Sequence, residues 1–293
     1  MPDTASLLGP TPHQSPATRS PSTWCAELAL GYEHTDGRTT LARRHHLGPL
    51  VVQKPLYPEG DAVCHTIVVH PPGGIAGGDN LDIAVDAGTQ SHILLTTPGA
   101  TKWYKANNRE AKQRVRLALA ANALVEWLPQ ETILFDGTMA RITLAVDLAK
   151  NARYFGWDIT VLGRQASGES FDTGSMRQQT VIRQQGREIF SECAALAGSD
   201  DLLVSPVGLA GCHVSGTMLV AGDACPAHLL DACREIDPDD KALHSLTRLP
   251  GALVARYLGS SPQSARAYFA ALWFRLRPWF AGREAVTPRI WRT

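Results

Sequence analysis

The sequence lacks the local motifs that mark common metal sites and hydrolases, and each absence argues against a class of protein. The six cysteines are scattered and form no CxxC pair, which argues against a disulfide scaffold and a zinc knuckle. The ten histidines include no HxH or HExxH motif, which argues against a tight zinc site. No GxSxG elbow occurs, and the sequence offers no convincing catalytic set.

Charge and hydropathy limit the partners of the chain. Lys and Arg total 28 and Asp and Glu total 28, so no net field steers the chain toward nucleic acid or an anionic membrane, and neutrality favours association. No apolar run approaches the roughly 18 residues of a membrane span. Residues 1–22 are rich in Pro, Ser and Thr and lack the regions of a secretory signal. We therefore expect a disordered leader over residues 1–22 and a cytoplasmic protein that binds neither nucleic acid nor membrane.

The rest of the chain is globular in composition, and its first two thirds have the pattern of β-strands. Hydrophobic residues make up 44% of the sequence and charged residues 19%, so the chain should fold. Alternating runs predict half-buried strands, and uniformly apolar runs predict strands covered on both faces. A β core over residues 23–225 follows, in which a sandwich, a barrel and a β-helix all remain open. The alternating runs are Leu81–Asp86, Arg114–Leu117, Arg141–Asp147 and Trp157–Val161, and the apolar runs are Ile67–Val69, Ile93–Leu95 and Leu202–Val204.

The pattern changes after about Asp223, where apolar residues recur at spacings of three and four. This spacing predicts a helical segment and tail over residues 226–293, packed on the core. We expect Pro278 to end the last helix and residues 286–293 to form an extended tail that docks on the protein. The expected helices are His228–Ile236, Lys241–Leu249, Ala252–Leu258 and Ser264–Leu276.

A loop with four glycines and two prolines, Pro71 to Asp79, separates two of the predicted strands. A phosphate-binding loop would need a GKS or GKT ending and a following helix, and neither is present. Glycine and proline together give the loop a specific backbone path, so we interpret it as a tight structural turn. Asp79 at its end is a possible ligand.

Three further carboxylates lie in contexts that allow either pairing or function. Glu131 follows a proline in an apolar neighbourhood, where a carboxylate needs a backbone, arginine or cation partner. Glu169 has Arg164 nearby as an ion-pair partner, and with Asp172 it could instead face a polar channel for a divalent cation or serve a glycosidase.

Five ordered blocks give the chain a resemblance to a known family. Read in sequence, they resemble the urease accessory protein UreD family, called UreH in some bacteria. The resemblance runs from about Cys25 to the last residue, and chance is improbable for five blocks in the same order. The blocks are PPGGIAGGD (Pro71–Asp79), TTPGATKWYK (Thr96–Lys105), WLPQETILFDG (Trp127–Gly137), GRQASGE (Gly163–Glu169) and PRIWRT (Pro288–Thr293).

The resemblance implies a mainly β fold of β-helix-like stacked sheets with a few helices toward the C-terminus. It also implies a non-enzymatic scaffold that works with UreF, the GTPase UreG and the urease apoenzyme subunits, so that nickel reaches the active site. No cofactor is expected to bind tightly; Ni²⁺ would bind transiently on an internal polar route. We assign Asp79, Glu131, Glu169 and Asp172 to that route from their burial and motif position. Aromatic residues expected to be exposed are assigned to partner binding or to capping the β core: Tyr268, Trp273, Trp279, Phe280 and Trp291.

Two other functions remain open at this point. One is a β-helical carbohydrate-active hydrolase that uses Glu169 with Glu131 or Asp172 as a carboxylate pair. The other is a structural scaffold through which no metal passes.

Overall fold

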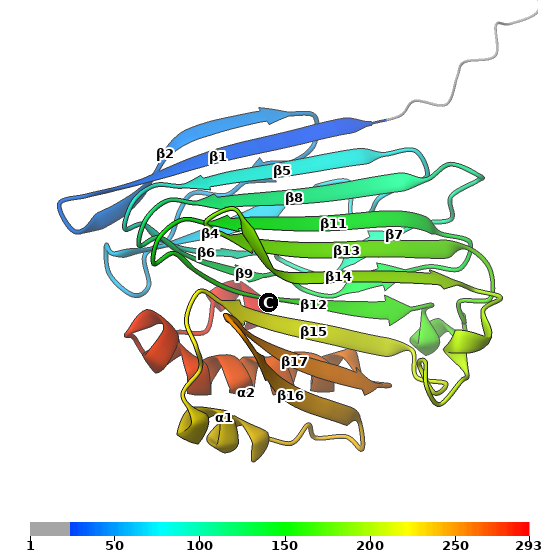
Figure 1. The fold of residues 1–293 in the computed structure, drawn as a ribbon. Coiled ribbons are helices and arrows are strands. Elements are labelled where there is room, and N and C mark those ends of the chain that lie inside the picture. Colours follow the sequence, from blue (N-terminus) through cyan, green and yellow to red (C-terminus); the bar gives the residue numbers. More distant parts are fainter. Residues whose placement is uncertain (1–23, 293) are drawn as a thin grey trace, which may run out of the picture.

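The computed structural model describes residues 24–292, so the predicted leader lies outside the described residues. Two β-sheets lie over one another (Figure 1). The first sheet contains β1 (Cys25–Thr35), β2 (Arg38–Leu47), β5 (Asn80–Ala87), β8 (Ala111–Leu119), β11 (Met139–Leu148), β13 (Ser175–Gln184) and β14 (Arg187–Ala197), in the order β14-β13-β11-β8-β5-β1-β2.

The second sheet is larger and runs in the order β16-β17-β15-β12-β9-β6-β4-β3, with β10 and β7 attached beside β12. Its strands are β3 (Val51–Val52), β4 (Val63–Val69), β6 (His92–Thr96), β7 (Thr101–Trp103), β9 (Leu124–Leu128), β10 (Thr132–Leu134), β12 (Arg153–Leu162), β15 (Val214–Ala221), β16 (Leu243–Leu249) and β17 (Ala252–Gly259).

The chain alternates between the sheets from β4 to β13, and each of these strands pairs in parallel with a strand of the neighbouring turn. This repetition is a β-solenoid of about four turns, as the β-helix-like prediction required. Antiparallel strands extend it: β2 and β14 lie at the edges of the first sheet, and β15, β17 and β16 continue the second. Within residues 24–292, no helix is both long enough and apolar enough to cross a membrane.

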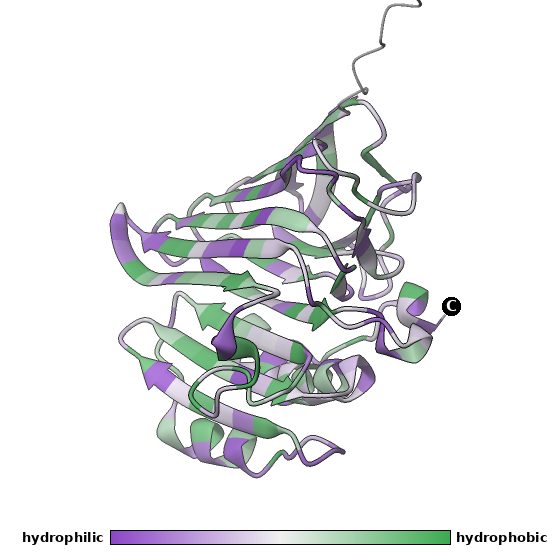
Figure 2. Ribbon diagram, turned by 90° about the vertical axis from the view of Figure 1, so that its right-hand side faces the viewer, coloured by the Kyte–Doolittle hydropathy of each residue, from purple (hydrophilic) through white to green (hydrophobic). Residues whose placement is uncertain are grey.

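Period-2 alternation places one side chain in two between the sheets. In β5, Leu81, Ile83 and Val85 are buried between the sheets while Asp82 and Asp86 face outward. Figure 2 shows this alternation of hydrophilic and hydrophobic residues along the strands. The first sheet therefore has one buried face and one solvent-exposed face, which is the pattern that the sequence predicted.

Three expected elements are wrong. Residues Lys241–Leu249 and Ala252–Leu258 form the hairpin β16–β17 rather than helices, because the free edge of β15 pairs with β17 along its whole length. Gly251, with φ of 82°, makes the turn between them. Leu202–Val204 contributes to a short 3₁₀ helix, η2 (Asp201–Leu203), with Leu202 and Val204 exposed.

Two α-helices lie in the C-terminal segment, as predicted: α1 (Ala227–Arg234) and α2 (Pro262–Ala281). The Ser261 hydroxyl caps α2 by accepting a hydrogen bond from the Ser264 amide, and Pro262 occupies the first turn. Pro278 does not end α2, which continues to Ala281 and stops before Gly282, where φ is 63°. The carbonyl that Pro278 leaves without a donor belongs to Phe274, an exposed residue, so water can satisfy it.

A second hydrophobic core fills the space between α2 and the outer face of the second sheet. The expectation that Tyr268, Trp273 and Phe280 are exposed is wrong, since each is at most 2% exposed in this core. The tail docks as predicted, but its end forms the 3₁₀ helix η3 (Arg289–Arg292) and not an extended segment. Trp291 packs against Trp273, and its indole donates to the Thr96 hydroxyl at 2.8 Å. The second sheet is thus covered on both faces.

A buried charge cluster fixes α2 on this sheet. The Arg277 guanidinium, 0% exposed, contacts Glu126 at 2.9 Å and Glu59 at 2.6 Å. His92 pairs with Glu126 at 2.7 Å and His65 with Glu59 at 2.6 Å. Burial pushes the pKa of Glu126 upward, but the hydrogen bonds and charges of His92 and Arg277 outweigh it and hold that pKa at about 2.

We predict that Arg277→Met strongly destabilises the protein, because it leaves two buried carboxylates short of their shared cation. The expected loss in the free energy of unfolding is about 3 to 5 kcal/mol, measured by urea unfolding. Arg275→Met, on the exposed side of the same helix, is the matched control and should change stability by no more than about 0.5 kcal/mol. Equal stability of the two variants would contradict a stabilising role for the cluster.

Candidate functional site

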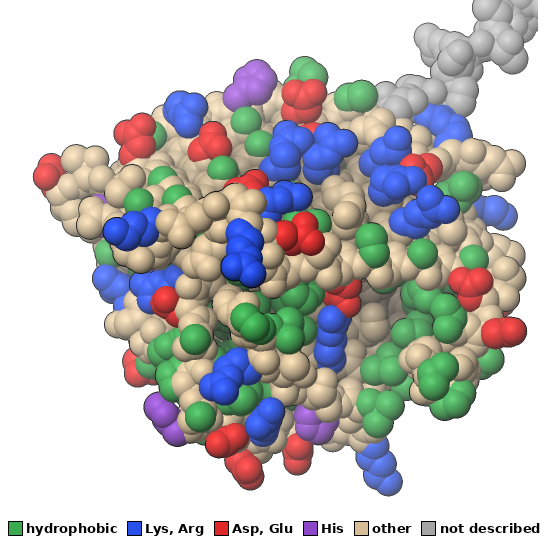
Figure 3. Space-filling model, in the orientation of Figure 1, with side chains coloured by type: hydrophobic (Ala, Val, Ile, Leu, Met, Phe, Trp, Pro, Cys, Tyr) green, Lys and Arg blue, Asp and Glu red, His purple; other side chains and the backbone are tan. Residues whose placement is uncertain are grey.

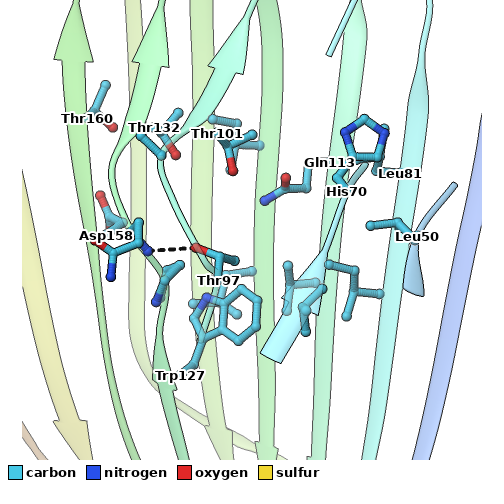
Figure 4. Close-up of a pocket in the computed structure, with 18 of the residues that line it drawn as sticks. Leu50, His70, Leu81, Thr97, Thr101, Gln113, Trp127, Thr132, Asp158 and Thr160 are labelled. Carbon is cyan, nitrogen blue, oxygen red and sulfur yellow. Dashed lines mark hydrogen bonds between the residues drawn. The ribbon is translucent and has the colours of Figure 1, made fainter. Parts of the chain in front are cut away.

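A cavity of about 220 Å³ lies between the two sheets, with a mainly apolar wall that also carries several polar side chains (Figure 4). Apolar side chains such as Leu81 and Val115 line it from the first sheet, and Trp127 lines it from the second. Polar groups from several strands also face it, although the rest of the space between the sheets is filled by hydrophobic residues. Buried polar groups cost stability unless they are satisfied, so their concentration in one place indicates a site.

One wall of the cavity is a row of threonines. Thr101, Thr132 and Thr160 occupy β7, β10 and β12 and are direct register partners. Their side chains lie next to one another in Figure 4, with the Gln113 amide beyond them. The row offers hydroxyl oxygens along a single line across the second sheet.

Asp158 is a carboxylate that faces this cavity. Its neighbours Trp157 and Ile159 point outward into the core under α2, so the alternation of β12 turns Asp158 inward. Burial raises the pKa of Asp158 to about 6; a hydrogen bond with the Gln178 amide opposes that rise, and the charge of Glu192 adds to it. The ionised form of Asp158 is therefore destabilised by burial, and its hydrogen-bond partner is a neutral amide and not a cation.

His70 is the second ionisable side chain on the cavity wall, and in Figure 4 it lies on the opposite side from Asp158. Its Nδ1 atom is buried and has no hydrogen-bond partner among the described residues. Burial lowers the pKa of His70, against the opposing charge of Asp79, which favours the neutral imidazole. A neutral imidazole nitrogen is a metal ligand.

The glycine-rich loop that precedes β5 is a tight turn closed by Asp79. The buried Asp79 carboxylate accepts hydrogen bonds from the backbone amides of Ala76 at 2.9 Å and Trp24 at 3.3 Å. A Cβ atom at Gly77 would lie 1.9 Å from the carbonyl oxygen of Ala106, so only glycine fits there. The charge of Asp79 affects His70, which lines the cavity, but the Asp79 side chain itself is not part of the wall.

The other three carboxylates assigned from the sequence also have partners outside the cavity. Glu131 is buried and lies 3.5 Å from Arg266 of α2. Glu169 forms an ion pair with Arg164 at 2.5 Å and accepts from the Asp136 amide at 3.1 Å, which is the pairing that the sequence offered as the alternative to a ligand role. Asp172 is exposed and accepts from the Ser170 hydroxyl.

Sequence reasoning thus missed the two ionisable groups that line the cavity, Asp158 and His70. Asp158 falls in an alternating run that was interpreted as half-buried, with its acid facing solvent. The available signal was the apolar surface of the last helix, which covers the outer face of this sheet and leaves only the interior for the polar side chains of β12. Among residues 24–292, no three His, Cys, Asp or Glu side chains come together as a metal cage.

Comparison with known proteins gives a consistent match over nearly the whole chain. The UreD urease accessory protein family matches residues 25–292. The chain is similar to the "Urease accessory protein UreD" of Dechloromonas aromatica, 53% identical over 94% of this chain and 96% of the relative. The proteins of the same name from Methylobacillus flagellatus and Azoarcus sp. are 50% and 48% identical, each over 92% of this chain and over 95% and 94% of their own length.

The pKa of Asp158 leads to a stability prediction. Between the ordinary value of 3.8 and the folded value of about 6, the folded state binds more protons than the unfolded state, so stability falls as pH rises through this window. Asp158→Asn should therefore raise the free energy of unfolding by roughly 2 to 3 kcal/mol at pH 8, with a smaller gain at pH 4.5.

Urea unfolding at the two pH values measures this difference. Asp147→Asn is the control, because that carboxylate is 61% exposed and its replacement should give no pH-dependent gain. A lower free energy of unfolding for Asp158→Asn at pH 8 would show that the ionised carboxylate does not destabilise the folded state.

Proposed function

Because the chain belongs to the UreD urease accessory protein family, we propose that it assists nickel insertion into apo-urease and that nickel passes through the cavity between its sheets, along the polar side chains of its wall. The observation that carries the proposal is Asp158, a carboxylate kept inside a solenoid core without a closed ligand cage around it.

The donors on the cavity wall suit transient binding of a divalent cation. Nickel accepts imidazole nitrogen and carboxylate oxygen, and the threonine row with Gln113 adds neutral oxygen atoms. One carboxylate among neutral donors attracts a cation without holding it firmly. Passage requires this balance, since each site must bind well enough for entry and weakly enough for release.

The positions of the ionisable groups give the route a direction across the core. His70 and Asp158 lie on opposite sides of the cavity (Figure 4), and the charge of Asp79 acts on His70. We place Asp79 at the His70 end, where its negative charge favours a cation on the route. Glu131, Glu169 and Asp172 are proposed to act outside the cavity, with Glu131 nearest to it through its neighbour Gln130 on the wall.

The hydrolase alternative is set aside, because accessory proteins of this family are not catalytic. The purely structural scaffold remains the competing function. The two hypotheses agree on the family and on the complex that the chain joins. They differ only in whether nickel passes through the interior of the protein.

The proposed partners are UreF, UreG and the urease apoenzyme, which the chain would meet in the cytoplasm. The C-terminal helix is the proposed surface for UreF. Phe274 on its outer side is 43% exposed, and Trp279 and Trp291 are partly exposed, whereas Tyr268, Trp273 and Phe280 would support that surface from below.

We predict that Asp158→Asn lowers nickel delivery while leaving the complex intact. In a strain that lacks the chromosomal gene, the unmodified chain should restore nickel-loaded urease, and Asp158→Asn should lower the nickel content and the rate of activation by about tenfold. Nickel per urease subunit is measured by metal analysis of the purified enzyme, and complex formation by co-purification with UreF and UreG.

Asp147→Asn is the control, as an exposed carboxylate of the neighbouring sheet. Full activation by Asp158→Asn in an intact complex would favour the structural scaffold. Fully metallated urease in the deletion strain itself would refute the accessory function.

A further inference from the structure

We propose that Arg256 is a displaceable counter-cation that closes one end of the cavity, and that an incoming divalent cation replaces it between Glu192 and Asp158. The inference rests on the proposed function, since it assigns the residues that control entry to the same cavity. It concerns a binding site that includes two carboxylates from different sheets.

The first observation is a polar row on the inner face of the second sheet. Asp158 of β12 pairs in register with Thr217 of β15, and Thr217 pairs with Arg256 of β17. Successive register partners on adjacent strands project to the same side of a sheet. The row therefore continues the polar wall of the cavity from Asp158 outward to Arg256.

The second observation is an ion pair between the two sheets at the end of this row. The Arg256 guanidinium contacts Glu192 of β14 at 2.6 Å and donates to the Thr217 hydroxyl at 2.7 Å. Strands β14 and β17 are not paired with each other, so this contact joins the sheets through side chains alone. Both Arg256 and Glu192 also interact electrostatically with Asp158.

The pair lies beyond Asp158 along this row and is partly exposed to solvent. The side chains of Arg256 and Glu192 are 41% and 32% exposed, whereas Asp158 lies on the cavity wall. Figure 3 shows a hollow in the surface below β14, bordered by hydrophobic side chains as well as acidic and basic ones. A cation that enters from this side meets the pair before it reaches Asp158.

The charges of the group explain why the guanidinium can be displaced. Two carboxylates, Glu192 and Asp158, share one cationic side chain, so the group has one negative charge in excess when both acids are ionised. A divalent cation neutralises both carboxylates once Arg256 turns toward solvent. Arginine holds a position of this kind well because its long side chain can swing out while its charge stays hydrated.

The consequence is low affinity by competition. A nickel ion can bind Glu192 only after the Arg256–Glu192 ion pair breaks. This competition lowers its affinity and shortens the time for which it stays bound. Removing the positive charge should therefore convert a site for passage into a site that retains the cation.

The experiment measures Ni²⁺ binding to the full-length chain by titration calorimetry with nickel chloride. Arg256→Gln should bind one Ni²⁺ at least about tenfold more tightly than the unmodified chain. Arg256→Lys keeps the charge and should bind within about twofold of the unmodified chain. The double variants Arg256→Gln with Glu192→Gln, and Arg256→Gln with Asp158→Asn, should lose the gain.

The controls separate the outcomes. Unchanged affinity in Arg256→Gln, with far-UV circular dichroism and unfolding like those of the unmodified chain, would overturn the inference, as would a gain that survives both double variants. If Arg256→Gln does not fold, Thr217→Val still tests the proposal. It removes the hydrogen bond from Arg256 to the Thr217 hydroxyl, so Arg256 is displaced more easily and nickel affinity should rise modestly. Normal urease activation by Asp158→Asn alone would count against the route and not against the calorimetric result.

Discussion

The second sheet is covered on both faces, and this constraint determines where every polar group of its strands can go. The first sheet packs on its inner face, and α2 with the tail packs on its outer face. A polar side chain on β6, β9 or β12 therefore cannot reach bulk water by alternation alone. It must find a partner outward under α2 or inward between the sheets.

The two possible directions give two kinds of buried carboxylate. Glu126 points outward and is fully paired by Arg277 and His92, which keeps its pKa at about 2 despite complete burial. Asp158 points inward, hydrogen-bonded to the neutral Gln178 amide and near the Arg256–Glu192 ion pair, and burial raises its pKa to about 6. The first arrangement stabilises the docking of α2, and the second leaves a charge that a cation can satisfy. The two acids thus differ in the partners that surround them: Glu126 is fully paired with cations, and Asp158 is not.

Local patterns in the sequence predicted most of the strands well and the site poorly, while the β-helix-like architecture came from the family resemblance. Strands such as β5 and β11 follow from alternation, and the tight turn before Asp79 follows from its glycines and prolines. The hairpin β16–β17 could not be predicted from local spacing, because the edge of β15 that pairs with it is formed by distant residues.

The site residues were missed for the same reason. Whether Asp158 faces water or a cavity depends on what covers the other face of β12, and that cover is α2, about a hundred residues away along the chain. The pairing of Glu169 with Arg164 was accessible from the sequence because the two residues are five apart. Local pairs can be inferred from local sequence, and contacts between layers cannot.

The ionic groups inside and beside the cavity also explain why a weak cation site needs a large scaffold. A carboxylate such as Asp158 destabilises its surroundings, so the fold must supply stability elsewhere, and the Arg277 cluster with its hydrophobic core does so on the opposite face of the same sheet. Arg256 then limits the negative charge that the free protein exposes to its interior. A small domain buries less apolar surface and has less stability to offset a carboxylate that lacks a full cationic partner in its core. The core under α2 thus provides the stability that an ionised Asp158 takes from the space between the sheets.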